Sequence, residues 1–172
     1  MSRKEIDMSY VSELRSMVGH FPLQLPGTGV VLWRKSVDGE IEVLLQLRQD
    51  NDKFGLLGGG IELNETYEEC ALREVKEESG IEFSIQDLQL RGVYAGPKHI
   101  TIKPNGDVIH HTVVVYSIYY YGTMIFEHDL PETTDLSWFT ISRLREILQE
   151  APEVFFPNNV PIIWDVAYKF FE

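Results

Sequence analysis

Hydrophobic and polar positions along the chain predict a mixture of strands and helices. Short runs of alternating or continuous apolar residues, which are typical of strands, cover residues 28–33, 43–47, 88–96, 108–121 and 135–139. Apolar residues recur near helical spacing in residues 4–18, 66–79, 140–150 and 161–171. Strands and helices do not alternate regularly along the chain. The pattern therefore predicts an α+β fold, in which helices cover the faces of a mixed sheet.

Turn and capping residues mark the ends of some of these elements. The pair Asp38-Gly39 lies between the first two predicted strands and favours a tight reversal of the chain. Thr66 is followed three residues later by Glu69, which predicts a capping box at the start of a helix. Gly80 is a typical residue for ending that helix. The helix 66–79 is thus bounded by its own sequence.

Composition indicates a globular chain that forms a single domain over residues 1–172, with 44% hydrophobic and 24% charged residues. Residues 1–25 are expected to form an N-terminal helical extension. The longest apolar runs are short, so we expect no membrane span, and the charged N-terminus lacks the apolar core of a secretion signal. Cys70 is the single cysteine, which excludes an intramolecular disulfide and fits a cytoplasmic protein.

The chain is strongly acidic. Its 15 basic and 27 acidic residues give a net charge of −12. Nucleic-acid binders usually carry a basic face, so this charge argues against a nucleic-acid partner. It remains compatible with a small phosphorylated ligand, because divalent cations bound between protein and phosphate would separate the negative charges.

Part of the acidic charge is concentrated in the predicted helix 66–79. Glu74, Glu77 and Glu78 are spaced i, i+3 and i+4, so a helix places them on one face. Like charges at this spacing destabilise a helix, and the last turn also disfavours negative charge. One interpretation is a solvated acidic face. The other is half of a site for a hard divalent cation such as Mg²⁺, completed by water and a phosphate.

Three glycines a few residues before this helix, Gly58, Gly59 and Gly60, favour the second interpretation. A glycine turn allows the backbone to approach a ligand closely, and the start of a helix attracts anions. The glycine turn and the helix together span residues 54–81. Glycines, a capped helix and a carboxylate ladder in this order are a more specific signal than any one of them alone.

From Gly59 to Ile81 the sequence resembles the Nudix box, G-x5-E-x7-R-E-U-x-E-E-x-G-U, in which U is a bulky apolar residue. The specified positions are occupied by Gly59, Glu65, Arg73-Glu74-Val75, Glu77-Glu78 and Gly80-Ile81. All seven specified residues and both apolar positions match. The chain therefore resembles the Nudix hydrolase family.

The resemblance implies an α/β/α sandwich around a mixed β-sheet. It also implies hydrolysis of the pyrophosphate bond in a nucleoside diphosphate linked to another group, with Mg²⁺ or Mn²⁺ as the cofactor. The implied metal ligands are Glu74, Glu77, Glu78 and the carbonyl group of Gly58. Arg73 would orient the glutamates by pairing with them, and Glu65 would brace the loop and helix.

Such hydrolysis needs a group that accepts a proton from the attacking water. Glu78 and Glu77 are the candidates within the box. In parts of the family the base instead lies on a later loop, where the available acidic residues are Glu127, Asp129, Glu132 and Asp135. The sequence does not choose between these positions.

Two positions depart from the family pattern. The family often has Trp-x-x-Pro before the glycines, where this chain has Phe54-Gly55-Leu56-Leu57. Without the proline we expect a turn that is less rigidly preset. Asn64 stands where glycine is common, a mild change because Asn tolerates left-handed backbone better than most residues.

Substrate-binding candidates lie around the glycine turn. Arg48 and Lys53 are on the strand and loop that lead into it, and the backbone of Gly59 and Gly60 would approach the phosphates. Other residues weighed for ligand contacts are His99, His110, His111, Tyr116, Tyr119, Tyr120 and Tyr121. We expect these seven to have structural or surface roles.

Several functional alternatives remain open at this stage. The small nucleotide substrate is an oxidised or ordinary nucleoside triphosphate, ADP-ribose or a dinucleoside polyphosphate. An RNA 5′ end is disfavoured by the acidic charge. A different class is a non-catalytic Nudix domain that binds a nucleotide as a sensor or adaptor, although such domains usually lose box glutamates. An isomerase would need further catalytic groups. The N-terminal helix is either a homodimer contact or a cover for the domain.

Overall fold

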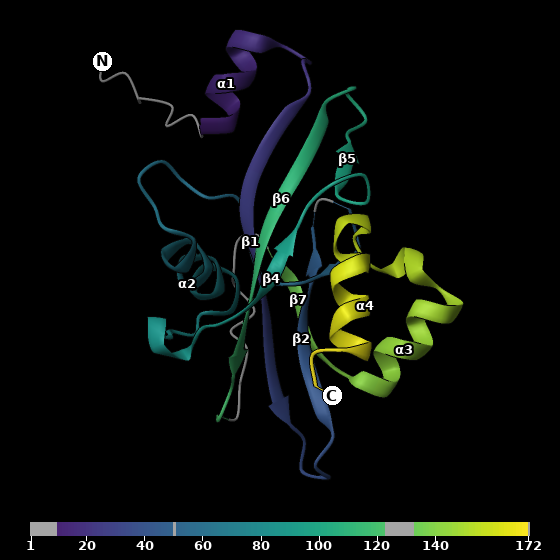
Figure 1. The fold of residues 1–172 in the computed structure, drawn as a ribbon. Helices are drawn as coiled ribbons and strands as arrows, with labels where there is room; N and C mark the ends of the chain where they lie inside the picture. Colours follow the sequence, from purple (N-terminus) through teal and green to yellow (C-terminus); the bar gives the residue numbers. More distant parts are fainter. Residues whose placement is uncertain (1–9, 50, 123–132, 172) are drawn as a thin grey trace.

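The computed structural model describes residues 10–49, 51–122 and 133–171. A seven-stranded sheet forms its centre, with the strand order β3-β2-β1-β6-β4, while β5 pairs with β6 and β7 pairs with β2 (Figure 1). The strands are β1 (Leu23–Lys35), β2 (Ile41–Arg48), β3 (Phe54–Gly55), β4 (Gln89–Tyr94), β5 (Ile100–Ile102), β6 (Val108–Tyr119) and β7 (Thr133–Thr140). The α-helices are α1 (Tyr10–Val18), α2 (Tyr67–Ser79), α3 (Ile141–Glu150) and α4 (Val160–Tyr168).

The two long central strands run parallel to each other. β1 and β6 pair from Leu23 opposite Ile109 to Trp33 opposite Tyr119, whereas the pairings of β1 with β2, β2 with β3 and β7, and β6 with β4 and β5 are antiparallel. A parallel pair is normally covered on both faces. Residues 30–32 of β1 are accordingly fully buried. The sheet is therefore mixed, as the sequence predicts.

Successive residues of β1 enter two separate hydrophobic cores. Val30 and Leu32 pack with Val75 of α2 on one face, while Val31 packs with Ile162 and other residues of α3 and α4 on the opposite face. Figure 1 shows α2 on one side of the sheet and α3 with α4 on the other. The side-chain period of two residues along a strand produces this division. The arrangement confirms the predicted α/β/α sandwich.

The helix α1 stands at one end of the molecule and contributes no buried residue to either core. Its Arg15 side chain donates from Nη2 to the carbonyl oxygen of Val108 at 3.3 Å and forms an ion pair with Asp107 at 3.5 Å. His20 Nδ1 lies 2.8 Å from the same Asp107 carboxylate. Polar contacts to the start of β6 therefore fasten α1 to the sheet. Residues 4–9 of the predicted helix lie outside the described residues.

Most element boundaries differ from the predictions by a few residues. β1 extends well beyond the predicted strand 28–33, because β6 pairs with it along its length. α4 ends at Tyr168 rather than at residue 171. β3 and β5 were not predicted, since two or three residues are too few to show a periodicity. Among the described helices, none is both long and apolar enough to cross a membrane.

Candidate active site

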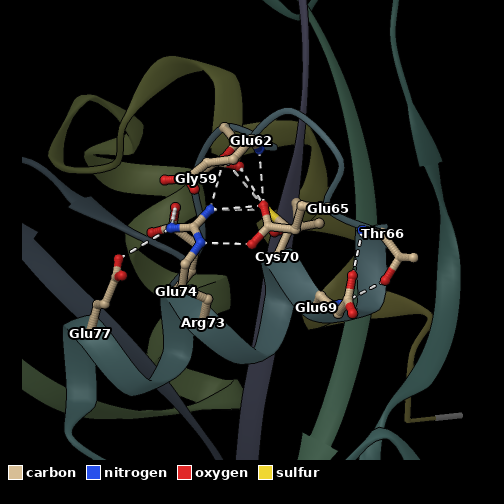
Figure 2. Close-up of polar contacts among 11 residues, drawn as sticks. Gly59, Glu62, Glu65, Thr66, Glu69, Cys70, Arg73, Glu74 and Glu77 are labelled. Carbon is tan, nitrogen blue, oxygen red and sulfur yellow. Dashed lines mark hydrogen bonds and ion pairs between the residues drawn. The ribbon is translucent and has the colours of Figure 1, made fainter. Parts of the chain in front are cut away.

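The helix α2 begins and ends as its sequence predicts. The Thr66 hydroxyl accepts a hydrogen bond from the Glu69 amide at 3.2 Å, and the Glu69 carboxylate accepts one from the Thr66 amide at 2.8 Å (Figure 2). Gly80 takes the left-handed conformation with φ 74° and donates its N–H to the carbonyl of Lys76 at 2.8 Å. The capping box and the glycine stop are both confirmed, so the two ends of the helix that carries the glutamates are set by its own sequence.

The glycine turn lies beside β1 and is hydrogen-bonded to its backbone. Thr28 donates its amide to the carbonyl oxygen of Gly59 at 2.9 Å, and Val30 donates to that of Leu57 at 2.8 Å. A Cβ atom on Gly58 would lie 2.2 Å from the Thr28 carbonyl oxygen, and the φ of Gly58 is 134°. Only glycine therefore fits at position 58.

The next two glycines have different surroundings. A Cβ atom on Gly59 would lie 2.4 Å from Oε1 of Glu74, whereas one on Gly60 would meet nothing within 4 Å. Gly59 thus leaves the space that the Glu74 carboxylate occupies. Gly60 is not required by packing.

The departures from the family pattern are accommodated locally. Leu57, which replaces the proline, is fully buried in the core beneath α2, and its carbonyl is held by Val30. Burial of the Leu57 side chain and this hydrogen bond hold the turn in place, a task that the fixed backbone of a proline would otherwise perform. Asn64 has φ 67°, the left-handed conformation that Asn tolerates.

Arg73 is the centre of the polar network (Figure 2). Its guanidinium donates to both carboxylate oxygens of Glu65, at 2.7 and 3.1 Å. It also donates to Glu74 at 2.8 Å and to Glu77 at 3.2 Å, and to the carbonyl oxygen of Gly60 at 3.1 Å. The hydrogen bond to Glu65 is the largest cause that raises the pKa of Arg73, and it lowers the pKa of Glu65. The single positive charge of Arg73 therefore offsets the negative charges of three carboxylates.

Glu78 faces the sheet and is only 4% exposed. Its Oε1 accepts a hydrogen bond from Nε2 of Gln46 at 2.7 Å, and its Oε2 accepts one from the amide of Gly58 at 2.8 Å. Burial raises the pKa of Glu78 to about 8, although both hydrogen bonds oppose this shift. A buried carboxyl group of this kind is ionised more easily when a cation lies beside it.

Glu74, Glu77 and Glu78, the three glutamates on one face of α2, differ in exposure. Glu74 and Glu78 are buried, whereas the side chain of Glu77 is 58% exposed. Among the residues that the structure describes, no three His, Cys, Asp or Glu side chains are grouped so as to hold a metal ion. Arg73 instead contacts Glu74 and Glu77. The donor set itself fits a hard divalent cation, since three carboxylates project from neighbouring turns of one helix and two of them are buried.

Two residues of this network were not identified from the sequence. Gln46 is a polar residue inside the apolar run of β2, and the isolated polar position in VLLQL was the available signal. Cys70 is fully buried, with its sulfur 3.3 Å from the Thr28 hydroxyl and 3.7 Å from Nη2 of Arg73. Burial raises the pKa of the Cys70 thiol to about 11, so it is a neutral packing residue beneath the glycine turn.

Other predicted residues lie at varying distances from this network. The guanidinium of Arg48 lies over the Phe156 ring, 5.3 Å from its centroid, and its charge lowers the pKa of Glu78. The Lys53 ammonium donates to the carbonyl oxygen of Glu153 at 2.5 Å, so the structure does not bring it to the α2 carboxylates. Substrate binding by Arg48 and Lys53 stays a prediction.

The later acidic residues are only partly described. Asp135 is exposed in β7, and its carboxylate accepts a hydrogen bond from Ser137 at 3.1 Å. The candidates Glu127, Asp129 and Glu132 lie outside the described residues. The choice of base therefore remains between Glu77, Glu78 and this later segment.

The histidines and tyrosines have structural surroundings. His99 is buried and His110 is exposed, while His111 Nε2 lies 3.0 Å from the Thr101 hydroxyl. Tyr116 is buried and donates its hydroxyl to Glu68 at 3.1 Å, and the rings of Tyr119 and Tyr121 lie edge to face, with their centroids 4.3 Å apart. Within the part of the chain that the structure describes, these contacts do not reach the carboxylates of Glu74, Glu77 and Glu78.

Comparison with known proteins places this chain in a family. Residues 23–158 match the model of the NUDIX domain, so the chain belongs to the NUDIX family. An ADP-ribose pyrophosphatase from Methanocaldococcus jannaschii is 41% identical over 81 residues, which are 43% of this chain and 45% of the relative. Nudix hydrolase 21, chloroplastic, from Arabidopsis thaliana is 38% identical over 80 residues, 46% of this chain and 40% of the relative. The chain thus matches less than half the length of either relative.

Solved structures share the fold. The NUDIX domain of Shewanella oneidensis NrtR, complexed with ADP ribose, has a TM-score of 0.63 and 18% identity, with 90% of this chain and 96% of that chain covered. The Bacillus halodurans MutT protein has a TM-score of 0.60 and 18% identity, with 84% of this chain and 82% of that chain covered. At these identities the likeness concerns the fold alone.

Proposed function

We propose that this chain hydrolyses the pyrophosphate bond of a nucleoside diphosphate linked to another group. The observation that carries the proposal is the buried Glu78 carboxyl, held against the amide of Gly58 at 2.8 Å at the end of a helix that also presents Glu74 and Glu77. Burying an ionised carboxyl group costs folding free energy unless an opposite charge lies beside it, so Glu78 is not explained by a contribution to the stability of the fold. Its position beside a glycine turn fits a role with a bound cation and a phosphate.

A divalent cation, Mg²⁺ or Mn²⁺, is proposed as the cofactor. Glu74, Glu77 and Glu78 would hold it, together with the carbonyl group of Gly58. Such an ion would neutralise charge on the phosphoryl oxygens and lower the pKa of a bound water. Hard divalent cations prefer oxygen ligands, which all four of these groups supply.

The residues of the chain divide the remaining tasks. Arg73 orients Glu74 and Glu77 through its hydrogen bonds at 2.8 and 3.2 Å, and Glu65 holds Arg73 in that position. A carboxylate accepts the proton of the attacking water as the phosphorus–oxygen bridge breaks, and the leaving phosphate keeps the bonding electrons. Glu78 and Glu77 are the candidates for this base among the box residues.

ADP-ribose is the first substrate to test. The Methanocaldococcus relative, 41% identical over the matched 81 residues, is an ADP-ribose pyrophosphatase, and the NrtR domain with the same fold is complexed with ADP ribose. Water attack on either phosphorus of ADP-ribose releases AMP and ribose 5-phosphate. Nucleoside triphosphates and dinucleoside polyphosphates are the comparison substrates.

The decisive experiment is a hydrolysis screen across these nucleotides with Mg²⁺ or Mn²⁺, in which products are separated by chromatography. Glu77→Gln and Glu78→Gln are compared with wild type, and both are expected to lose at least about a hundredfold in kcat/KM. Glu82→Gln is the matched control. Glu82 is an exposed glutamate that pairs with Lys76 at 2.5 Å, beyond the end of α2.

Each outcome of the screen is informative. Metal-dependent products from wild type that are lost in Glu78→Gln but kept in Glu82→Gln would support the proposal. Tight ADP-ribose binding without products from any nucleotide would favour the non-catalytic sensor or adaptor instead. Equal activity of wild type, Glu77→Gln and Glu78→Gln would contradict the assignment of Glu77 and Glu78 to the active site.

We also propose a cytoplasmic location and a homodimer. The single cysteine fits a reducing compartment. The N-terminal region exposes apolar side chains, namely Tyr10, Met17, Val18 and Phe21. Size-exclusion chromatography with light scattering, before and after removal of residues 1–19, tests whether this region joins two copies of the chain.

A further inference from the structure

Gln46 is a buried polar residue in the middle of β2. It is 1% exposed, and its neighbours in the strand, Leu44 and Leu45, are fully buried. Its Nε2 donates to Oε1 of Glu78 at 2.7 Å and to the carbonyl oxygen of Leu56 at 3.2 Å. Both partners are acceptors, so the hydrogen-bond network requires the amide nitrogen to face them.

Gln46 and Gly58 hold the two oxygens of one carboxylate. Oε1 of Glu78 accepts from Gln46 and Oε2 accepts from the Gly58 amide at 2.8 Å. Two donors on separate oxygens determine the plane of the carboxylate as well as its distance. The side chain of Glu78 therefore has one preferred orientation instead of several rotamers.

The same amide also joins three separate parts of the chain. Gln46 belongs to β2, Leu56 lies in the glycine turn just before its three glycines, and Glu78 lies in the last turn of α2. The contact from Gln46 to Glu78 spans 32 residues of sequence, and that from Gly58 to Glu78 spans 20. Gln46 therefore helps to set the position of the glycine turn relative to the end of α2, together with the direct hydrogen bond from Gly58 to Glu78.

We propose that Gln46 is a positioning residue that aims the Glu78 carboxylate at the reaction site. Its effect on hydrolysis rests on the proposed function, but its effect on the orientation of Glu78 does not. Hydrogen bonds to charged groups contribute more than neutral ones, and misplacing a catalytic group slows turnover more than it weakens substrate binding. Loss of Gln46 is thus expected to lower kcat while KM stays nearly constant.

Gln46→Met tests this inference because methionine has a similar length and volume but no hydrogen-bond donor. In the active enzyme we expect kcat to fall about ten- to hundredfold and KM to change less than about threefold. The same substitution in a Glu78→Gln background should change kcat by less than about threefold, because Gln46 acts through Glu78. Equal effects in both backgrounds would contradict the proposal.

Two further measurements do not depend on hydrolysis. The first is the NMR signal of the Gly58 amide, which should shift and exchange faster with solvent in Gln46→Met as its bond to Glu78 loosens. The second is Mn²⁺ binding measured by electron paramagnetic resonance, in which the affinity should fall at least about threefold in Gln46→Met. In the Glu78→Gln background, Gln46→Met should leave the Mn²⁺ affinity unchanged.

Ser117→Ala is the matched control. Ser117 is also 1% exposed, lies in β6 and accepts a hydrogen bond from Arg91 at 2.7 Å, away from Glu78. It should lower the melting temperature without altering the Gly58 signal, Mn²⁺ affinity or kcat. If Gln46→Met does not fold, Gln46→Asn takes its place, since it keeps the amide but is one carbon too short to reach both partners.

The outcomes separate this inference from the proposed function. If wild type hydrolyses no nucleotide, the proposed function fails, while the Gly58 signal and Mn²⁺ affinity still decide the role of Gln46. If Gln46→Met leaves both of these at their wild-type values, Gln46 merely fills space, and the inference is overturned even in an active enzyme.

Discussion

The guanidinium of Arg73 holds the carboxylate of Glu65 by two hydrogen bonds, from Nε at 2.7 Å and from Nη2 at 3.1 Å. The pair joins the loop before α2 to the middle of the helix. The planar fork of arginine matches the two oxygens of a carboxylate, which a lysine ammonium does not. The remaining Nη1 is thereby directed at Glu74 and Glu77, at 2.8 and 3.2 Å.

Arg73→Lys should therefore destabilise the protein although the charge is kept. We expect the free energy of unfolding to fall by about 1–2 kcal/mol, because the two-point contact with Glu65 is lost. Urea denaturation measures this change. Arg143→Lys serves as the control, since Arg143 pairs with Glu146 where both side chains are at least half exposed, and a change below about 0.5 kcal/mol is expected. Equal losses in the two variants would contradict the central role of Arg73.

Gly59→Ala should impair the site more than the fold. The added Cβ would lie 2.4 Å from Oε1 of Glu74, the movable end of a side chain, so the carboxylate must shift. We expect the free energy of unfolding to change by less than about 1 kcal/mol and kcat/KM to fall at least about tenfold. Thermal melts and the hydrolysis assay together test this.

Gly58→Ala and Gly60→Ala, the substitutions on either side of Gly59, should destabilise the protein to very different degrees. At Gly58 the added Cβ would meet the Thr28 carbonyl oxygen at 2.2 Å with φ at 134°, so a loss of about 2–4 kcal/mol in unfolding free energy is expected. At Gly60 there is open space, and no loss of stability is expected. The activity of Gly60→Ala then reports whether the backbone approaches the substrate there. A stable Gly58→Ala would show that the turn is placed differently.

The buried Glu78 predicts an unusual pH dependence in metal-free protein. Its folded pKa, about 8, lies above the usual value of 4.5, so the folded state retains a proton that the unfolded state releases. Its contribution to stability is fully present below pH 4.5, falls between pH 4.5 and 8, and is constant above that. The total loss is at most about 5 kcal/mol, since each tenfold change in proton affinity is about 1.4 kcal/mol.

Comparison with Glu78→Gln isolates this dependence. In EDTA, the difference in unfolding free energy between Glu78→Gln and wild type should grow in favour of the variant as the pH rises from 5 to 8. Adding Mg²⁺ at pH 8 should stabilise wild type more than the variant, because the cation favours the ionised carboxylate. A difference that does not change with pH would contradict the raised pKa.

Cys70 should be protected from thiol reagents in the native protein. It is the single cysteine, so all thiol reactivity of the chain reports on it. It is fully buried and its pKa is about 11, so very little thiolate is present at pH 8. We expect its reaction with Ellman's reagent to be at least about a thousandfold slower in native buffer than in urea. Rapid stoichiometric reaction of the native protein would show that the glycine turn opens.

The local features of α2 were predictable because they are encoded by neighbouring residues. Thr66 and Glu69 reach each other's backbone within one turn, and Gly80 ends the helix because glycine readily adopts the left-handed conformation. The spacing of Glu74, Glu77 and Glu78 likewise follows from helical geometry. Matches of this kind depend on contacts fewer than about five residues apart.

The two short strands and the extent of β1 were not predictable in the same way. β5 contains three residues and is a strand only because β6 lies beside it. β1 extends over Leu23–Lys35 because β6, about 86 residues further along the chain, pairs with it. Pairing partners so distant in sequence leave no periodic signal within the strand itself.

The sequence by itself determined the family, the ends of the central helix and the order of glycines and carboxylates, since each depends on residues close together in the chain. Only the tertiary structure decided how the three glutamates differ. Glu77 is exposed, Glu74 occupies the space left by Gly59, and Glu78 is buried against Gln46. Burial and hydrogen bonds from β2 and the glycine turn set these environments. They come from residues distant in sequence, so helical spacing alone does not predict them.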